Sequence, residues 1–401
     1  MPRDLTSTKL SRKVRVCARP LLPFTWIITF TALCLLFIYT PEITWKRLPF
    51  LRSDLMDSKD VVSRGDVTIK NNTDGRGIPR HHLFFLKVHK AASSTVQNVL
   101  LRSALRYNLT VLLPNRGHYF SEKNKNYWEK VLPLNRSDHY DILCCHLVYN
   151  ETFVREYMPN DTLFVAIVRE PFAQVLSAFH YFSNVFPKRY LVAIPGPVPF
   201  LTYLENPSRW EHINVNESFT NNRMSFDFGL EPSQFYNTSE IKRFIEQIDK
   251  RFDLVMIHEM FDESLVFLKR LAGWNFRDII YMRTNSFDRT VKYNFTAEHR
   301  SKHQQFEAAD YALYEHFLGK FKRKLAEAGE DFKQEVEEFR KIVYAVWHFC
   351  SGPKDVKYSL HFHATHWSSE FDFVAEECLL LKRSEIAFIH FMRLRHKGML
   401  T

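Results

Sequence analysis

The sequence predicts an α/β fold in which a P-loop-like parallel sheet is flanked by helices, with a helical C-terminal region, behind a single N-terminal transmembrane helix. Three observations support this prediction. Four apolar runs are typical of buried strands, three of them lead into helical patterns, and one uncharged N-terminal segment is long enough to cross a bilayer. Strands that alternate with helices pair in parallel through crossover connections.

The N-terminal region predicts a type II signal anchor. The segment Leu21–Tyr39 carries no charge, and basic residues dominate the sequence before it, which places the N-terminus in the cytosol. A cleaved signal peptide is the alternative, but no small-x-small cleavage pattern follows. The predicted organisation is a cytoplasmic tail (1–20), a transmembrane anchor (21–39), a luminal stem (40–80) and a single luminal domain (81–401).

The first predicted strand, Leu83–Val88, ends in a loop typical of phosphate binding. The loop reads His-Lys-Ala-Ala-Ser-Ser-Thr from His89 to Thr95, and a helix starts near Ser93. Backbone N–H groups at a helix N-terminus favour an anion, and Lys90 and the hydroxyls add donors. The absence of G-x-x-x-x-G-K-[ST] excludes the nucleotide triphosphatase loop. A helix that is merely capped by Ser93 or Ser94 is the alternative interpretation.

Two further strands place polar groups at their ends. Tyr140–Leu147 carries His146 near its end, and Thr162–Val168 is followed by Arg169. A helix begins near Pro171, and its residue Ser177 points away from the apolar stripe. An arginine and a serine so placed can bind one phosphate from two sides. A salt-bridged Arg169 with a solvent-facing Ser177 is the alternative.

The fourth strand, Phe252–His258, leads into a helix near Met260, and helical patterns continue from about Ala297 through Leu325 and over Phe332–Phe349. The last fifty residues show no clear pattern. Because carboxyl ends of parallel strands meet at one edge, a ligand site is expected there. The polar residues at these ends are Lys90, His146, Arg169 and Glu259.

Sequons and cysteines support a luminal body. More N-x-S/T sequons occur than chance predicts, all beyond the anchor, at Asn71, Asn108, Asn135, Asn150, Asn160, Asn216, Asn237 and Asn294. Disulfides persist in such a compartment, and the luminal cysteines are Cys144, Cys145, Cys350 and Cys378. Four cysteines allow three pairings, and the sequence does not choose among them. The histidines at 361, 363 and 366 lack matching cysteines or carboxylates, so no metal site is predicted.

The net charge of +10 is spread along the chain without a dominant basic run. A protein in the lumen is not exposed to nucleic acid. A basic cleft that binds an anionic donor is therefore the more economical explanation of the positive net charge.

These motifs resemble those of the Golgi galactose 3-O-sulfotransferases. The order Lys-x-x-Ser-Ser-Thr after a strand resembles the 5′-phosphosulfate loop of sulfotransferases, and Arg169 with Ser177 resembles their 3′-phosphate site. The string FLKVHKAASSTVQNVLLR is similar to this Golgi family in particular. One departure is Arg169-Glu170-Pro171, where the family often has Arg-Asp-Pro. The resemblance covers most of Leu83–Phe321 and is poor after Phe332.

The resemblance implies a sulfotransferase fold for residues 81–401 and an enzyme of the Golgi membrane. Its reaction would be transfer of sulfonate from 3′-phosphoadenosine 5′-phosphosulfate (PAPS) to the 3-hydroxyl of terminal β-galactose on glycoproteins or glycolipids. PAPS is the implied co-substrate, galactose-terminated glycans are the implied acceptors, and a homo-oligomer is compatible with this reading. No strict metal requirement is expected, because Lys90 can neutralise charge on the leaving oxygen.

The resemblance also implies roles for individual residues. The donor-binding set is His89, Lys90, Ala92, Ser93, Ser94, Thr95, Arg169 and Ser177. Lys90 and His146 are the expected catalytic residues, with His146 as the base; His89 is the competitor and a structural role for His146 is the alternative. Lys87 could substitute for Lys90, and Arg223 is a candidate sugar contact. Asp227-Phe228-Gly229 does not indicate a kinase, because no glycine-rich or H-R-D loop accompanies it.

Two other functions fit the same sequence features. One is a different Golgi carbohydrate sulfotransferase, acting on a glycosaminoglycan uronate, which would favour a long basic groove. The other is a non-catalytic luminal glycan-binding protein, which would tolerate loss of Lys90 and Arg169.

Overall fold

The computed structural model describes residues 79–134, 139–282, 293–352 and 359–399. Its centre is a four-stranded sheet in the order β2-β1-β3-β4, and all three strand pairs are parallel. The strands are β1 (Leu83–Leu86), β2 (Ile142–Leu143), β3 (Leu163–Val168) and β4 (Leu254–Ile257). The predicted parallel sheet is thus confirmed, and every residue of these strands is buried.

The second strand is much shorter than predicted. Of Tyr140–Leu147, only Ile142–Leu143 pairs with β1. The outer side of this segment instead meets an irregular loop, through hydrogen bonds from Leu112 N to Ile142 O (2.8 Å) and from Phe120 N to His146 O (2.8 Å). A buried apolar run therefore need not be a full strand when a loop satisfies its backbone.

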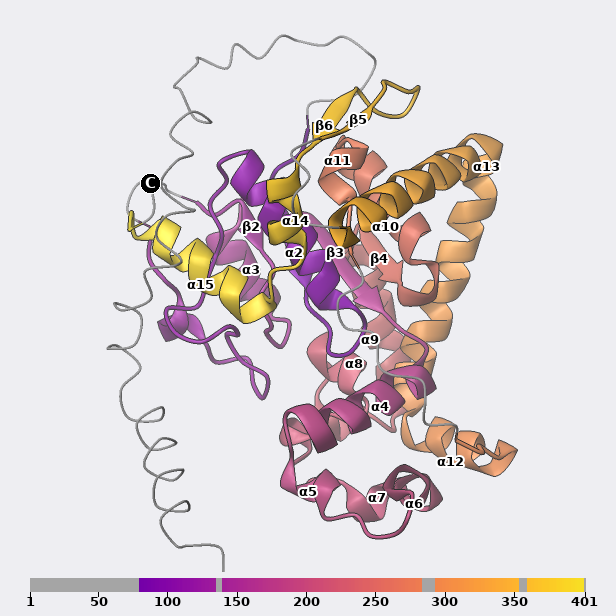
Figure 1. The fold of residues 1–401 in the computed structure, drawn as a ribbon. Helices are drawn as coiled ribbons and strands as arrows, with labels where there is room; N and C mark the ends of the chain where they lie inside the picture. Colours follow the sequence, from indigo (N-terminus) through magenta and orange to yellow (C-terminus); the bar gives the residue numbers. More distant parts are fainter. Residues whose placement is uncertain (1–78, 135–138, 283–292, 353–358, 400–401) are drawn as a thin grey trace, which may run out of the picture. The chain divides into compact units, whose positions relative to one another are not determined.

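Helices surround the sheet in the predicted alternation (Figure 1). Helices α10 and α13 contact β4, whereas α11, α14 and α15 contact α2. The α-helices before β4 are α2 (Ser93–Arg106), α3 (Glu151–Tyr157), α4 (Pro171–His180), α5 (Arg189–Val192), α6 (Pro199–Glu205), α7 (Pro207–Trp210), α8 (Arg223–Asp227) and α9 (Thr238–Arg251). Those after β4 are α10 (Phe261–Ala272), α11 (Phe276–Ile279), α12 (Ala297–Phe306), α13 (Ala308–Ser351), α14 (Ala375–Leu381) and α15 (Glu385–His396). Short 3₁₀ and π segments are η3 (Trp128–Lys130), η4 (Tyr181–Val185), η5 (Val215–Glu217), η6 (Pro232–Gln234) and η7 (His258–Met260).

The predicted helix starts near Ser93, Pro171 and Met260 are confirmed by α2, α4 and α10. The side chain of Glu170 accepts the Phe172 and Ala173 N–H groups, and Pro171 occupies the first turn of α4, where its missing N–H costs nothing. The two predicted C-terminal helices are joined as α13, with Gly329 (φ 71°) at the kink between them.

The described residues contain a second apolar cluster beside the sheet. Helix α4, η4 and the helices α5 and α6 bury aromatic and aliphatic side chains against one another, separately from the core around the sheet. Its largest members are Phe172, Phe179, Phe182, Phe200, Tyr203 and Phe219. This cluster fixes α4 and η4, which flank the carboxyl end of β3.

The last part of the chain returns to the first helix. A hairpin of β5 (Leu360–Phe362) and β6 (Phe371–Phe373) is followed by α14 and α15, and both of these helices contact α2. A disulfide joins Cys350 at the end of α13 to Cys378 in α14. Cys144 and Cys145 are buried free thiols, and burial raises the pKa of both; of the four cysteines within the described residues, only Cys350 and Cys378 are therefore paired.

Among the residues described here, no helix combines the length and the apolar character that a membrane span needs. The predicted anchor Leu21–Tyr39 and the sequons at Asn71 and Asn135 lie outside the described residues.

Candidate functional site

The loop after β1 has the backbone of an anion cradle. Two of its non-glycine residues adopt left-handed conformations, Lys90 with φ 59° and Ala92 with φ 62°. Ala92 is the N-cap of α2, and no side chain caps the helix; Ser93 Oγ instead donates to Val88 O at 2.6 Å. Capping by Ser93 or Ser94 is therefore wrong as an explanation of these hydroxyls. A long helix with an uncapped N-terminus offers its first N–H groups and dipole to an anion.

Lys87 lies at the centre of the site, immediately after β1. Its side chain is 1 % exposed, and Nζ lies 3.1 Å from Ser94 Oγ, 2.8 Å from His146 Nε2 and 2.9 Å from Glu385 Oε2. The sequence suggested Lys87 only as a substitute for Lys90. The structure gives Lys87 the contacts to the hydroxyl loop and to the predicted base.

The hydrogen bonds of His146 define its protonation state. Its Nδ1 lies 2.7 Å from the Lys87 carbonyl oxygen, which can only accept, so Nδ1 carries the proton. Nε2 then accepts from Lys87 Nζ. Burial, with the charges of Lys87 and His89, lowers the pKa of His146 well below its ordinary value. The imidazole is therefore neutral, in the tautomer that leaves Nε2 as a proton acceptor.

Glu385 reaches this cluster from α15, almost 300 residues later in the chain. Its Oε2 accepts from Lys87 Nζ and from Ser94 Oγ at 2.9 Å each. Burial alone would raise the pKa of this carboxyl, but the Lys87 charge and the two hydrogen bonds lower it, so Glu385 is ionised. A carboxylate thus rests against the hydroxyl and ammonium groups that a donor phosphate would use.

His89 lies on the other side of His146, with the two rings stacked at 4.0 Å between centroids. Its Nδ1 is 2.8 Å from Asp227 Oδ2, and its Nε2 is 3.1 Å from Glu122 Oε1. Burial raises the pKa of both carboxyls, but His89 and Arg223 more than offset this: the pKa of Asp227 is lowered and that of Glu122 falls to about 2. Both ring nitrogens of His89 are held by carboxylates, which favours His146 over His89 as a base.

Arg223 is the buried partner of this network. It is 1 % exposed, and its guanidinium contacts Asp227 Oδ1 (2.9 Å), the Ser218 and Glu122 carbonyl oxygens (3.0 and 2.9 Å) and His89 Nδ1 (3.3 Å). A sugar hydroxyl would have to displace one of these partners. The geometry therefore gives Arg223 a supporting position behind His89.

Lys90 and Arg169 are brought together at the ends of β1 and β3. Arg169 Nη1 donates to the Lys90 carbonyl oxygen at 3.0 Å, and Lys90 Nζ lies 3.8 Å from the centre of the Tyr181 ring. Burial, then the charges of Arg169 and Lys87, lowers the pKa of Lys90 to about 8. Cations this close together repel one another, and a bound anion would relieve that repulsion. This arrangement therefore indicates an anion-binding position.

The remaining predicted donor residues occupy the same region. Ala92, Ser93, Ser94 and Thr95 span the start of α2, and Ser177 lies partly exposed on the second turn of α4. Within the described residues, the Ser177 hydroxyl makes no hydrogen bond to Arg169 or to the loop. Glu259 accepts the Glu170 N–H at 3.0 Å and the Tyr314 hydroxyl at 3.1 Å, so it serves the scaffold at this edge.

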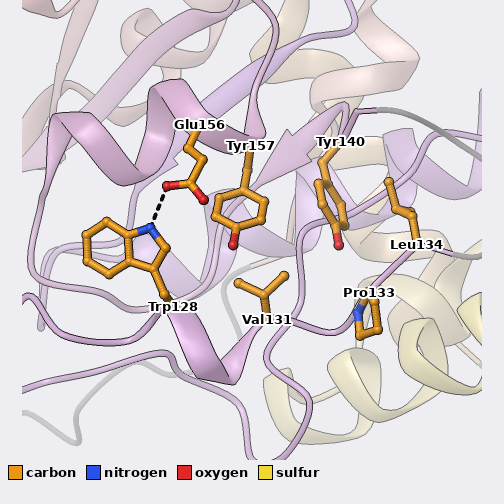
Figure 2. A pocket seen from close by; sticks show the side chains of 7 residues that line it. All are labelled: Trp128, Val131, Pro133, Leu134, Tyr140, Glu156 and Tyr157. Atoms are coloured by element: carbon orange, nitrogen blue, oxygen red, sulfur yellow. Dashed lines mark hydrogen bonds between the residues drawn. The ribbon is translucent and has the colours of Figure 1, made fainter.

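A pocket within the described residues lies away from this site. It has a volume of about 520 Å³ and is lined by Trp128, Val131, Pro133, Leu134, Tyr140, Glu156 and Tyr157 (Figure 2). Tyr140 precedes β2, whereas His146 follows it, so this pocket lies toward the amino end of the sheet. None of the predicted site residues lines it.

Several site residues had no clear signal in the sequence. Glu385 lies in a segment without a motif, and Glu122 lies in a polar loop between strands. Asp227 belongs to a Asp-Phe-Gly triplet whose only familiar association is with kinases. Tyr181, under Lys90, follows a helix whose apolar stripe gave it no special place.

Comparison with known proteins identifies relatives of most of the chain. The family model described as galactose-3-O-sulfotransferase matches residues 7–364. Similar proteins are Galactose-3-O-sulfotransferase 2 of Homo sapiens (35 % identical over 247 residues, 60 % of each chain) and Galactose-3-O-sulfotransferase 3 of Mus musculus (33 % over 282 residues, 68 % of this chain and 64 % of the relative). Galactosylceramide sulfotransferase of Homo sapiens is 29 % identical over 262 residues, which is 65 % of this chain and 62 % of the relative. The chain therefore matches less than two thirds of the length of each of these relatives.

Proposed function

Because this chain belongs to the galactose-3-O-sulfotransferase family, we propose that it transfers sulfonate from PAPS to the 3-hydroxyl of terminal β-galactose on glycoproteins or glycolipids. The single observation that carries the proposal beyond family membership is the anion cradle at the start of α2. There, an uncapped helix terminus and two lysines converge with Arg169 at the carboxyl ends of β1 and β3. An ATP-dependent enzyme of the P-loop type would need the glycine-rich motif that this loop lacks.

We assign donor binding to the loop and to the start of α4. The N–H groups of the α2 terminus, with Ser93, Ser94 and Thr95, would hold the 5′-phosphosulfate, next to His89, Lys90 and Ala92. Arg169 and Ser177 would hold the 3′-phosphate, because a guanidinium provides a forked, permanently charged set of donors. Burial, together with the charges of Arg169 and Lys87, lowers the pKa of Lys90, and this concentration of cations supports the fit.

In the proposed reaction, the galactose O3 forms a bond to sulfur while the bond from sulfur to the bridging phosphate oxygen breaks. His146 Nε2, which accepts from Lys87 Nζ in the structure, would take the hydroxyl proton once the acceptor hydroxyl replaces that contact, and the Nδ1–H bond to the Lys87 carbonyl oxygen keeps Nε2 unprotonated. Lys90, with Lys87, would neutralise the charge on the departing oxygen. These groups can perform the transfer without a metal, and we expect no strict metal requirement.

The proposed setting is the Golgi membrane, with a single type II anchor at Leu21–Tyr39 and the catalytic domain in the lumen. The family match begins at residue 7 and so includes the predicted anchor. Galactose-terminated glycans are the proposed acceptors, and no nucleic acid partner is expected.

The test is transfer of labelled sulfonate from PAPS by the purified full-length chain to a panel of terminal β-galactosides. Product on free galactosides and none on the same compounds with a blocked 3-hydroxyl would support the donor, the reaction and the position together. Product on a glycosaminoglycan alone would show a different acceptor. Binding of galactosides without any turnover would favour the glycan-binding alternative.

A further inference from the structure

Three potential metal ligands meet at the amino ends of the parallel strands. His82 directly precedes β1, and His139 and Asp141 precede β2; one ligand atom from each lies within 4.8 Å of the others. The donor loop follows the opposite ends of these strands. With about 3.3 Å per residue along β3, roughly 20 Å separates the two edges.

The distances suit a small tetrahedral ion. Asp141 Oδ1 lies 3.5 Å from His82 Nε2 and 3.4 Å from His139 Nε2. With metal–ligand bonds of about 2.0–2.1 Å, two ligands of a tetrahedral ion are about 3.3–3.4 Å apart. The two histidine–carboxylate separations are therefore already close to what such an ion requires, and the ligand nitrogens of the two imidazoles lie within 4.8 Å of one another.

Two of the three ligands are also oriented from behind. His82 Nδ1 lies 2.6 Å from Asp161 Oδ1, which directs Nε2 toward Asp141. The other oxygen of Asp141, Oδ2, accepts from Thr110 N at 2.6 Å and from Thr110 Oγ1 at 2.7 Å, which directs Oδ1 toward the histidines. Outer hydrogen bonds of this kind orient the ligands of protein metal sites.

We propose that His82, His139 and Asp141 bind one divalent transition-metal ion of the zinc class, with the fourth position open to water. Two imidazoles and one carboxylate match the ligand preference of Zn²⁺ and not that of Mg²⁺ or Ca²⁺. The ion joins the segment before β1 to the segment before β2, so its role is structural and separate from sulfonate transfer.

Ordinary histidine–aspartate ion pairs are the competing explanation. The chain supplies a matched example: His361 Nδ1 lies 2.9 Å from Asp372 Oδ1 across the exposed β5–β6 hairpin. Within the described residues no third ligand joins that pair at metal-binding distance. His361 is therefore the control position.

The experiment measures Zn²⁺ binding to the metal-stripped full-length chain by calorimetry, with the thermal unfolding midpoint and the affinity for 3′-phosphoadenosine 5′-phosphate as readouts of folding. We expect one ion per chain, a rise in the midpoint with Zn²⁺, and loss of both in His139→Ala. Because His139 is half exposed, this variant should keep its fold. Asp161→Asn should bind Zn²⁺ about 10–100-fold more weakly, and His361→Ala should bind it as the unchanged protein does.

Absence of Zn²⁺ binding in the folded wild-type chain would overturn the proposal. So would equal affinity in wild type and in His139→Ala, because the ion would then be bound elsewhere. Neither result would bear on the proposed transfer reaction, whose donor affinity is measured in the same samples.

Discussion

Lys87 and Lys90 are three residues apart in the chain but have different surroundings. Lys87 is buried and contacts Ser94, His146 and Glu385, whereas Lys90 lies over the Tyr181 ring beside Arg169. A strand end and a left-handed turn separate the two side chains so that they approach the same region from different directions. The site therefore has one lysine beside the proposed base and another beside Arg169.

For His146, we expect His146→Gln to lower kcat by about 10²–10⁴-fold, the usual contribution of a general base. The affinity for 3′-phosphoadenosine 5′-phosphate, measured by calorimetry, should stay within a few-fold, since the donor residues remain. The neutral imidazole is the active form and its pKa is lowered, so activity should persist as the pH falls through 6.5 and decline only at more acidic pH. His361→Gln is the control, and equal loss of donor affinity would make His146 a structural residue.

For His303, burial and, to a smaller extent, the charge of Arg300 lower the pKa to about 3. This histidine therefore takes up a proton near pH 6.5 in the unfolded chain but not in the folded chain. As the pH falls from 6.5 toward 3, it therefore lowers the free energy of unfolding. Within that window the cost is about 1.4 kcal/mol per pH unit. Denaturant unfolding at several pH values should show a shallower pH dependence for His303→Gln than for wild type; identical slopes would contradict this.

At the scale of elements, Glu335 joins α13 to α10. This fully buried carboxylate accepts from Lys269 Nζ at 2.7 Å and from Arg270 Nε. Glu335→Ala would remove the buried carboxylate beside the buried Lys269 ammonium, and we expect a loss of about 3–5 kcal/mol in the free energy of unfolding. The exposed pair of Glu337 and Arg340 on the same helix is the control, since Glu337→Ala should cost at most about 1 kcal/mol. Similar losses in both variants would contradict the burial argument.

Helix α15 places the Glu385 carboxylate where it competes with a donor anion for Lys87 and Ser94. We expect Glu385→Gln to bind 3′-phosphoadenosine 5′-phosphate roughly tenfold more tightly, which corresponds to about 1.4 kcal/mol. Glu376→Gln, an exposed change of the same kind on α14, should leave the affinity unchanged. Weaker binding in Glu385→Gln would show that this carboxylate orients Lys87 for the donor rather than competing with it.

The elements that the sequence predicted well are those with a strong local pattern. β1, β3 and β4 are uninterrupted apolar runs, and α4 has both Pro171 at its start and an apolar stripe. The second strand was overestimated because its apolar run is buried against a loop and not against a strand. The positions of α14 and α15 could not be predicted, because their contacts with α2 join distant parts of the chain.

At the scale of the whole molecule, Lys90, His146 and Arg169 could be expected at one edge because parallel strands bring their carboxyl ends together. The strand order and the arrival of Glu385 depend on packing that no local pattern records. The same is true of the cluster of His82, His139 and Asp141, whose members precede two different strands. Residues next to strand ends could therefore be predicted from the sequence, whereas residues that tertiary contacts bring to the site could not.

Glycosylation tests which of the predicted sequons are accessible on the surface of the folded protein. Asn160 and Asn294 are exposed, whereas the Asn150 side chain accepts from Phe153 N at the start of α3 and is partly buried. We expect glycopeptide mass spectrometry of the full-length protein, expressed through the host's secretory pathway, to find glycans at Asn160 and Asn294 and little at Asn150. Full occupancy at Asn150 would mean that the sequon is modified before α3 forms.

The left-handed turns at Lys90 and Ala92 have a consequence for how the donor is received. Glycine would adopt them without strain, but a glycine loop stays mobile and would have to be ordered when the donor binds. Here the cost of the unusual backbone, of order 1 kcal/mol per residue, is met during folding. The cradle is thus rigid before it is filled, and less of the donor's binding energy is spent on ordering the loop.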